Sequence, residues 1–493
     1  MNGNFSIIIS KNKEIYLITD RLSTKPLFYR IQGNEIIFTS KIRTLAKLNT
    51  DLSFDLDYLT EYLSLARVLG TKTPLQDVKQ VPPATIAKFN STGEIKYQRY
   101  WRPEYNPLNE SYDYFVKRFH KAFEASIKER KSEDLDIGLM ISGGFDSRLV
   151  ASKISDSELF HINERMNKEA KIAKKVAAKT SNEFTFLKRD KRYYNKISEE
   201  SSKQNNFYGS VRSDKVRGFI DDLSEKDILL SGQYSDTFLE QIYLPRKKIR
   251  LKYDFKLPFV DKPNSLEEYK DNYLKNKWIN AKTGDKSHLV VHNRSMEEIF
   301  SENLFYRGNS IHSHGISYPD LKSLLTTSEF FPITNRNTYL FQEGLSDASV
   351  NRNPFLDNRI INLSLQLPLK YRIRKSLIQT ELTNHHRALS KIKHGEYNFY
   401  PKSGLPRETL ARFLKRVKRK FDMTDANNGP WADHEKKELE EDYKALKELG
   451  IFDREALSEI KDNEENYGIK YRLMTLSKMP ITKMVNKEDE QTY

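Results

Sequence analysis

The sequence contains no cysteine among its 493 residues. A chain without cysteine forms no disulfide, builds no thiolate zinc site and offers no cysteine nucleophile. It also lacks any apolar run close to the roughly 20 residues that span a bilayer. The apolar patch in the N-terminal stretch MNGNFSIIISKNKEIYL is too short for a secretion signal and precedes no small-residue cleavage site. These absences favour a globular cytoplasmic protein with no membrane span.

Basic residues outnumber acidic ones, 83 to 68, which gives a formal net charge of +15. They gather in two clusters, RKKIRLK at 246–252 and RFLKRVKRK at 412–420. In the second cluster apolar residues recur at helical spacing, which predicts a surface helix with a solvated basic face. The sequence has no zinc-finger, RRM or KH pattern, so a nucleic-acid partner is not favoured. An anionic partner stays open as the alternative interpretation of the charge.

The length exceeds that of one ordinary core, so two or three domains are expected. Residues 1–105 consist of short β-prone runs, with a helical pattern at 55–69 and a hairpin at 85–101. In the next region, 106–432, strands alternate with helices, which is typical of a parallel sheet covered by helices. Its predicted strands lie at 137–141, 159–162, 184–187 and 228–230, and its first two predicted helices at 112–130 and 168–180. Residues past about 265 are predicted to be mostly helical, and 433–493 to form a charged helical C-terminal extension.

The stretch IGLMISGGFDSRLVAS, residues 137–152, combines an apolar run with a glycine-rich junction. Glycines let a backbone approach a ligand closely, and the helix that follows presents free N–H groups. The hydroxyls of Ser142 and Ser147 complete a cradle suited to phosphate. A carboxylate such as Asp146 repels phosphate directly, so its presence predicts a bridging Mg²⁺ ion. Ligands of open parallel sheets bind beyond the carboxyl ends of the strands, where this junction lies.

The junction is not a Walker motif, because the Gly-Lys-Ser/Thr ending is missing. It resembles the SGGxDS pyrophosphate loop of the N-type ATP pyrophosphatases. Five further segments are similar to motifs of one branch of that group, the asparagine synthetase family. They are DRLSTKPLFYRIQGNEIIFTSKIRTL at 20–45, VPPATIAKFNSTGEIKYQRYW at 81–101, SGQYSD at 231–236, PFLDNRIINLSLQLP at 354–368 and PKSGLP at 401–406.

This resemblance implies an α/β fold of the adenine-nucleotide alpha hydrolase type, a Rossmann-like parallel sheet with helices. A small β-rich remnant of an Ntn glutaminase-like domain, residues 1–105, would precede it, and a helical region would follow. The resemblance also implies ATP and Mg²⁺ as cofactors. Pyrophosphate and ATP would be bound by Met140, Ser142, Gly143, Gly144, Asp146, Ser147, Ile162, Ser231 and Gly232. Catalytic roles would fall to Lys402, Asp146 and Asp236, with both aspartates holding the metal.

Two departures from the family pattern bear on function. The family's glutaminase domain begins with a nucleophilic cysteine directly after the initiator methionine, whereas Asn2 stands here and has no such chemistry. The matched segment begins deep inside that domain, so residues 1–105 are expected to be a truncated, inactive module. In the predicted acceptor site, formed by Gln233 and Arg352, Gln233 replaces a glutamate of the family and removes a partner for an ammonium group. Val350 stands where the family often has a second glutamate.

These features predict an ATP- and Mg²⁺-dependent amide-forming ligase that activates a carboxylate as an acyl-AMP. The acyl group would pass to ammonia, to ammonia from a separate glutaminase, or to an amine of a small molecule or peptide. Asparagine synthesis is the conservative form, and a specialised amide or macrolactam synthetase is the form that the altered acceptor site favours. A non-catalytic nucleotide-binding homologue remains an alternative from another class. Modification of tRNA is a minor one, since the cysteines that sulfur transfer usually needs are missing.

Two groups of histidines are weaker candidates. His385 and His386 are adjacent, and adjacent residues of a helix point to different sides, so they are interpreted as ordinary polar residues rather than metal ligands. The stretch IHSHGISYP at 311–319 is expected to be a loop with satisfied side chains, which leaves an acceptor-site role open.

Overall fold

The structure is a computed structural model of the chain. It describes residues 2–33, 35–48, 51–67, 69–132, 134–240, 244–250, 254–281, 284–292, 294–336, 338–372, 375–401, 403–404, 407–412, 414, 436–462 and 467–481.

Two small antiparallel sheets form the N-terminal part. One has the order β1-β2-β6-β7 and the other β4-β3-β5. Their elements and the two helices beside them are β1 (Ser6–Lys11), β2 (Glu14–Thr19), β3 (Phe28–Gln32), β4 (Glu35–Thr39), α1 (Ile42–Leu48), α2 (Leu56–Leu65), β5 (Lys79–Gln80), β6 (Thr85–Phe89) and β7 (Ile95–Arg99). Leu17, Tyr29 and Phe89 are buried in one apolar cluster, so the two sheets pack against each other. The predicted hairpin at 85–101 is confirmed by the pairing of β6 with β7.

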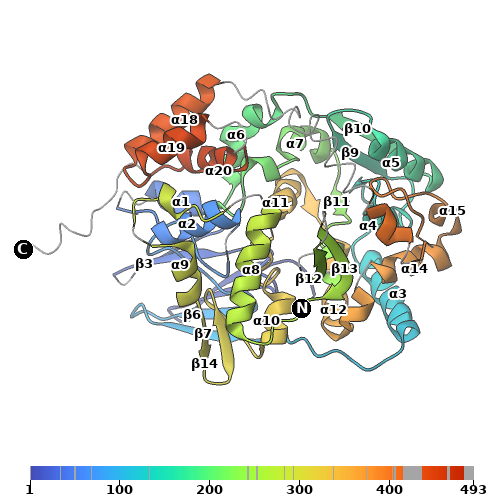
Figure 1. Cartoon of the computed structure of the whole chain (residues 1–493), viewed down its shortest axis with the longest axis horizontal. Helices are drawn as coiled ribbons and strands as arrows, with labels where there is room; N and C mark the ends of the chain where they lie inside the picture. Colours follow the sequence, from blue (N-terminus) through green and yellow to red (C-terminus); the bar gives the residue numbers. More distant parts are fainter. Residues whose placement is uncertain are drawn as a thin grey trace, which may run out of the picture.

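A five-stranded parallel sheet follows, with the order β10-β9-β8-β11-β17. Its strands are β8 (Ile137–Met140), β9 (Glu158–Asn163), β10 (Glu183–Lys188), β11 (Ile228–Ser231) and β17 (Val350–Asn351). The helices of this region are α3 (Tyr112–Lys128), α4 (Phe145–Ala151), α5 (Lys168–Lys179), α6 (Tyr193–Gln204) and α7 (Ile220–Ser224). The predicted alternation of strands and helices is confirmed. Figure 1 shows this sheet and the N-terminal sheets on opposite sides of α11 (Tyr339–Ala348).

The local sequence explains why these elements form. All four residues of β8 are buried, as expected of a strand covered on both faces. The side chain of Ser111 caps α3, and Phe115, Phe119 and Phe123 bury one stripe of that helix. Asn167 caps α5 in the same way by accepting a hydrogen bond from the backbone N–H of Ala170.

The chain order of the strands creates a switch point in the parallel sheet. From β8 the chain moves outward to β9 and β10, and it then returns to the other side of β8 to form β11. In open α/β sheets the crevice at such a reversal is where ligands bind. The glycine-rich junction after β8 and the residues after β11 therefore lie at the same edge.

The remaining described elements complete the second half of the chain. They are β12 (Arg246–Arg250), β13 (Asp254–Val260), α8 (Leu266–Ala281), α9 (Met296–Glu302), β14 (Leu304–Arg307), β15 (Ser310–Ser313), β16 (Ile316–Tyr318), α10 (Leu321–Thr327), α12 (Asn358–Gln366), α13 (Leu369–Arg372), α14 (Ser376–His385), α15 (Arg387–Ser390), α18 (Lys436–Glu448), α19 (Arg454–Asp462) and α20 (Tyr467–Ser477). Short turns of 3-10 helix are η1 (Val211–Ser213), η2 (Arg217–Phe219), η4 (Ser287–Leu289), η5 (Ile333–Asn335) and η6 (Pro354–Leu356), and η3 (Asp236–Glu240) is π-helical.

One expectation for this half was wrong, and another concerns residues outside the described ones. The loop expected at 311–319 is mostly strand, because β15 and β16 pair as part of a three-stranded sheet. Burial alternates along both strands, but over three or four residues, which is too short a run for a period of two to stand out in a sequence. The basic helix expected at 412–420 lies outside the described residues, apart from 412 and 414.

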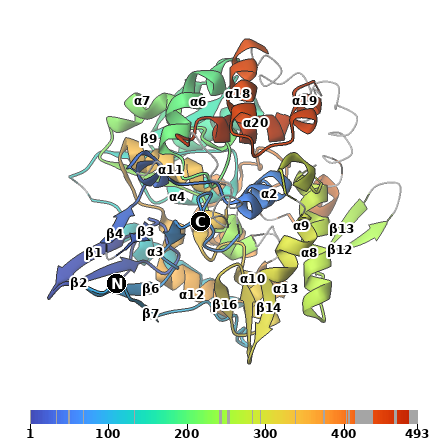
Figure 2. The same cartoon turned by 90° about the vertical axis from the view of Figure 1, so that its left-hand side faces the viewer.

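The C-terminal helices gather at one edge of the molecule beside α2 and α6 (Figures 1 and 2). Leu473 and Leu476 of α20 are fully buried, and the guanidinium of Arg472 donates to the Leu63 carbonyl at 2.9 Å. One apolar cluster runs from Leu22 to Ile481 and includes residues of all three predicted regions. The described helices of 433–493 are therefore part of the main core. No helix in the described part of the chain combines the length and apolar character needed to cross a membrane.

Candidate active site

The loop after β8 is held by its own serine hydroxyls. The backbone N–H of Ser142 donates to Ser147 Oγ at 3.0 Å, and the two hydroxyl oxygens lie 3.1 Å apart. The N–H of Gly144 in turn donates to Ser142 Oγ at 3.2 Å. These contacts bring the two predicted phosphate-binding hydroxyls together at the carboxyl end of β8.

Close backbone packing explains two of the glycines. A Cβ atom on Gly232 would lie 2.4 Å from the backbone nitrogen of Ser147, so the end of β11 is in contact with the first turn of α4. A Cβ on Gly143 would lie 3.0 Å from Gly395 Cα, and the N–H of Gly395 donates to the Gly143 carbonyl at 2.8 Å. The segment around residue 395 is thus part of the loop's surroundings, which the sequence did not indicate.

Asp146 lies in a cluster of charges at this edge. The ammonium of Lys375, just before α14, forms a hydrogen-bonded ion pair with Asp146 Oδ2. It also lies 3.8 Å from Glu240 Oε2. Asp236 contributes to the same electrostatic environment, because its charge raises the pKa of both Asp146 and Lys375. Arg336 Nη2 approaches Asp236 Oδ2 at 3.9 Å.

The pKa shifts in this cluster follow from burial and charge. Burial raises the pKa of Asp146, and the ammonium of Lys375 acts against that rise. For Lys375, burial lowers the pKa, but the charges of Asp146, Glu240 and Asp236 outweigh it and raise the pKa above its ordinary value. Lys375 is therefore a permanent cation among three carboxylates.

A further carboxylate contacts the loop from α5. The backbone N–H of Gly143 donates to Glu169 Oε1 at 3.3 Å. This N–H is one of the groups that a phosphate cradle would offer to a ligand. Glu169 therefore makes a contact of the kind that a bound phosphate oxygen would make.

Two of the residues predicted to bind ATP, Met140 and Ile162, lie at the ends of β8 and β9. Met140 is buried, with 8% of its surface exposed, in an apolar cluster that also contains Phe160 and Leu187. Ile162 is partly buried and packs against the same cluster. The structure thus brings Met140 and Ile162 into one apolar cluster next to the glycine-rich loop.

The predicted acceptor residue Gln233 lies in a network of neutral amides. Gln342 Nε2 donates to Gln233 Oε1 at 3.1 Å and to Ser231 Oγ at 2.9 Å. Asn353 Nδ2 donates to the same Ser231 hydroxyl at 3.1 Å and to the Gln233 carbonyl at 3.2 Å. Asn351 Nδ2 donates to the Gln342 backbone carbonyl at 3.0 Å and to its side-chain oxygen at 2.9 Å. Gln342 and Asn353 were not predicted from the sequence.

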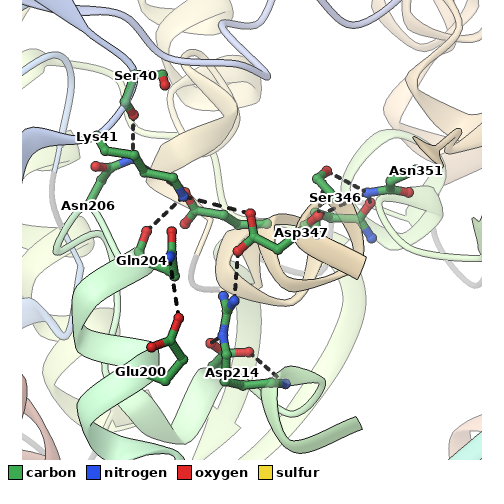
Figure 3. A network of polar contacts seen from close by, with 12 residues as sticks. Ser40, Lys41, Glu200, Gln204, Asn206, Asp214, Ser346, Asp347 and Asn351 are labelled. Atoms are coloured by element: carbon green, nitrogen blue, oxygen red, sulfur yellow. Dashed lines mark hydrogen bonds and ion pairs between the residues drawn. The ribbon is translucent and has the colours of Figure 1, made fainter. Parts of the chain in front are cut away.

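This network continues toward the N-terminal region through α11 (Figure 3). Lys41 Nζ donates to Glu343, the neighbour of Gln342, at 2.7 Å. It also donates to the Gln204 carbonyl at 2.9 Å, and Asn206 Nδ2 donates to the Ser40 carbonyl at 3.0 Å. The acceptor-side amides and the segment that follows β4 therefore contact adjacent residues of α11, Gln342 and Glu343.

Arg352, the second predicted acceptor residue, contacts a different part of the chain. Its guanidinium Nη1 donates to the Arg130 carbonyl at 3.3 Å, and its backbone N–H donates to Leu229 at 3.0 Å. A role of Arg352 in the acceptor site stays a prediction. Val350 begins β17 and has 55% of its surface exposed.

The side chain of Asn2 forms hydrogen bonds at the start of α12. Its side-chain amide donates to Asp357 Oδ2 at 2.9 Å, and its oxygen accepts from the N–H of Asn358 at 3.0 Å. Asp357 also accepts from Arg130 Nη1 at 2.8 Å and Arg359 Nη2 at 2.7 Å. Asn2 thus joins the N-terminal segment to the PFLD segment.

Comparison with known families adds to this geometry. The model of the family described as asparagine synthase matches residues 118–479, which is most of the chain. The chain belongs to the asparagine synthase family. A second match, to a glutamine amidotransferase domain, covers residues 1–101. The predicted resemblance and the α/β fold with a β-rich N-terminal part are thereby confirmed.

Individual relatives in this family are distant. Asparagine synthetase [glutamine-hydrolyzing] 1 of Bacillus subtilis is 27% identical over 154 residues, which cover 31% of this chain and 24% of that protein. Putative asparagine synthetase [glutamine-hydrolyzing] 2 of Methanocaldococcus jannaschii is 26% identical over 156 residues, 30% of each chain. The matched region thus spans about a quarter to a third of the length of these relatives.

Within this asparagine synthase fold, one predicted catalytic residue cannot be placed. Lys402 lies outside the described residues. Lys375, which sequence reasoning missed, contacts Asp146. It lies in the basic run KYRIRK, where no spacing singles it out from its neighbours.

The charge cluster fits a divalent cation. Asp146 Oδ1 and the hydroxyl of Ser235 are both buried. A hydrogen bond between Ser235 and the Asp146 carboxylate acts against the burial that raises the pKa of Asp146. Carboxylate and hydroxyl oxygens are ligands that Mg²⁺ prefers, and the charge of Asp236 acts on the same group. The fit of Asp146 and Asp236 to Mg²⁺ therefore has a basis in the packing as well as in the motif.

Proposed function

We propose that the protein is an ATP- and Mg²⁺-dependent ligase that forms amide bonds. The observation that carries this proposal is the meeting of two motifs at the switch point of the sheet. Gly232, after β11, lies against the backbone of Ser147 in the glycine-rich junction after β8. A nucleotide bound there would have the hydroxyls of Ser142 and Ser147 on its phosphates and the apolar surface of Met140 beside its base.

The proposed reaction has two steps. A carboxylate oxygen of the substrate attacks the α-phosphorus of ATP, which gives an acyl-AMP and releases pyrophosphate. An amine nitrogen then attacks the acyl carbon, AMP leaves and the amine loses one proton. Asp146 and Asp236 would hold Mg²⁺, which would neutralise charge on the phosphates. Lys375, a cation at the same edge, would stabilise negative charge that develops on the pyrophosphate.

The acceptor side supports a specialised amide ligase over asparagine formation. Gln233 is neutral, and Gln342 and Asn353, which hold it or its backbone, are neutral as well. A glutamate at this position would pair with an ammonium group, whereas an amide offers hydrogen bonds without charge. The substrates proposed are thus a small-molecule or peptide carboxylate and an amine. A cysteine-free chain would not hydrolyse glutamine through a thiolate.

The test is exchange of labelled pyrophosphate into ATP, with purified protein, Mg²⁺ and a panel of carboxylates that includes aspartate. Exchange with aspartate would support asparagine formation, and exchange with another acid would support the specialised ligase. A protein that binds ATP but gives no exchange across the panel would overturn the ligase in favour of a nucleotide-binding homologue. Asp146→Asn should abolish exchange with the fold intact, and wild-type exchange in that variant would remove the metal role of Asp146.

A further inference from the structure

A cluster of two histidines and a glutamate lies outside the candidate active site. His120 comes from α3, and Glu381 and His385 lie four residues apart on α14, so they share one face of that helix. One potential ligand atom from each residue lies within 4.8 Å of the other two. His120 Nδ1 is 2.8 Å from Glu381 Oε1, and His385 Nε2 is 3.8 Å from Glu381 Oε2. His386, by contrast, is not part of this group of ligand atoms.

The glutamate of this cluster is incompletely satisfied. The side chain of Glu381 is fully buried, and its Oε2 accepts no hydrogen bond from any residue that the structure describes. The two imidazole rings stack with their centroids 4.3 Å apart. A buried carboxylate oxygen without a partner is costly, whereas a cation between it and the two rings would satisfy all three groups.

The positive charge of Lys153 opposes the binding of a cation at this cluster. Lys153 Nζ lies 3.7 Å from Glu381 Oε1, but it is also ion-paired with Glu124. Glu124, Glu381 and Lys153 together carry a net negative charge, so the environment still attracts a divalent ion. Access is also open, because the side chain of His385 is 43% exposed and the residue lines a surface hollow of about 570 Å³.

We propose that His120, Glu381 and His385 form a binding site for a divalent metal of the zinc class. Two imidazole nitrogens and one carboxylate oxygen are ligands that Zn²⁺ takes readily, whereas Mg²⁺ and Ca²⁺ prefer oxygen alone. Ligand atoms around tetrahedral zinc are about 3.3 Å apart, given Zn–N bonds of about 2.0–2.1 Å, so small side-chain movements would close the present cluster on a metal. The exposed side of His385 leaves a fourth position for water.

The position of this site gives it a structural role. It joins the last turn of α14 to α3, and Lys375 stands immediately before the first turn of α14. The ten residues of α14 span about 15 Å. A metal at one end would thus fix the orientation of α14, whose first turn directly follows the residue that places its ammonium against Asp146. Metal binding at this cluster would not depend on the proposed ligase activity.

The experiment uses the full chain after treatment with a chelator and dialysis. Calorimetric titration with Zn²⁺ in excess Mg²⁺ should give one Zn²⁺ per chain, and Co²⁺ should give the visible absorption of a tetrahedral site. His385→Asn changes an exposed side chain and should lower the Zn²⁺ affinity at least about tenfold. His288→Asn, at another exposed histidine, is the matched control and should bind like the wild type.

Glu381→Gln should also weaken binding, because the amide carries no charge. Asp146→Asn should bind Zn²⁺ as tightly as the wild type, which separates this site from the charge cluster at the active site. Equal affinity in the wild type and His385→Asn would overturn the proposal. So would loss of zinc binding in Asp146→Asn, or no saturable binding in the wild type.

Discussion

Gly232 and Ser147 are in such close contact that a Cβ atom on Gly232 would lie 2.4 Å from the backbone nitrogen of Ser147. This contact joins the end of β11 to the first turn of α4. The contact sets the distance between the SGGFDS junction and the residues that follow β11. The geometry of the candidate nucleotide site therefore depends on the absence of a side chain at position 232.

We expect Gly232→Ala to reduce ATP–pyrophosphate exchange about 100-fold, because backbone must move to admit the methyl group and a misplacement of about 1 Å can cost that much. Circular dichroism should remain that of a folded protein. Gly284→Ala, where the added Cβ meets open space, is the control and should leave exchange unchanged. Exchange near the wild-type rate in Gly232→Ala would show that the two strand ends adjust freely.

Lys375→Met should increase the stabilisation that Mg²⁺ gives to the protein. In the wild type the ammonium of Lys375 pairs with Asp146, so a divalent cation must compete with it for that carboxylate. Without the ammonium, the carboxylate is left unpaired and binds the cation without competition. The measurement is the rise in Tm on adding Mg²⁺, with Lys96→Met, whose side chain is 74% exposed, as the control. An equal rise in wild type and variant would contradict this competition.

Gln233→Glu should change which amine is accepted and leave the KM for ATP within about twofold, since a carboxylate attracts an ammonium group that an amide does not. Gln342→Leu should affect amine selection too, because it removes the donor that holds Gln233 Oε1. The measurement is kcat/KM for a panel of amines at saturating ATP. An unchanged amine profile in both variants would exclude Gln233 from the acceptor site.

The fold was largely predictable because its signals are local. The strands near 137, 159, 184 and 228 and the helices near 112 and 168 were visible as apolar runs and helical periods, and the glycine-rich junction identified its own edge of the sheet. The strands at 304–318 were missed, because burial does not alternate along β14 and alternates over only three or four residues in β15 and β16.

The site was predictable only where a motif is continuous. Asp146, Ser147 and Gly232 belong to short strings that resemble motifs of the family, so sequence alone singled them out. Lys375 and Gln342 reach the site from α14 and α11, more than 100 residues further along the chain, and nothing in their local sequence indicates which neighbour they contact. The partner of His385 was missed for the same reason: His120 lies on another helix.

Asp357→Asn should destabilise the protein by about 3 kcal/mol at pH 7, because it removes the charge that balances the buried guanidinium of Arg130. Burial alone would raise the pKa of Asp357, but hydrogen bonds from Arg359 and Asn2 and the charge of Arg130 hold the pKa well below its usual range. The stabilisation that Asp357 gives is therefore complete above the unfolded-state pKa of about 3.9 and is lost progressively as the pH falls from there toward the much lower folded-state pKa.

The check on Asp357 is the free energy of unfolding between pH 7 and pH 3. The difference between the wild type and Asp357→Asn should shrink as the pH falls. Asp113→Asn serves as the control, because this carboxylate is 70% exposed in an ion pair with Lys117 and should have little effect at either pH. A constant difference between wild type and Asp357→Asn across the range would show that the charge of Asp357 is not what stabilises this contact.

The hydrogen bonds of Lys41 to Glu343 and Gln204 have a consequence for how the chain can be divided. Glu343 follows Gln342, the residue that donates to Gln233. Residues 1–105 therefore contact the helix that positions the predicted acceptor residue Gln233. A chain expressed without residues 1–105 is expected to lose its selectivity between amines before its affinity for ATP falls. If the proposed ligase activity holds, residues 1–105, which contain no cysteine for glutamine hydrolysis, would still contribute to selection of the amine.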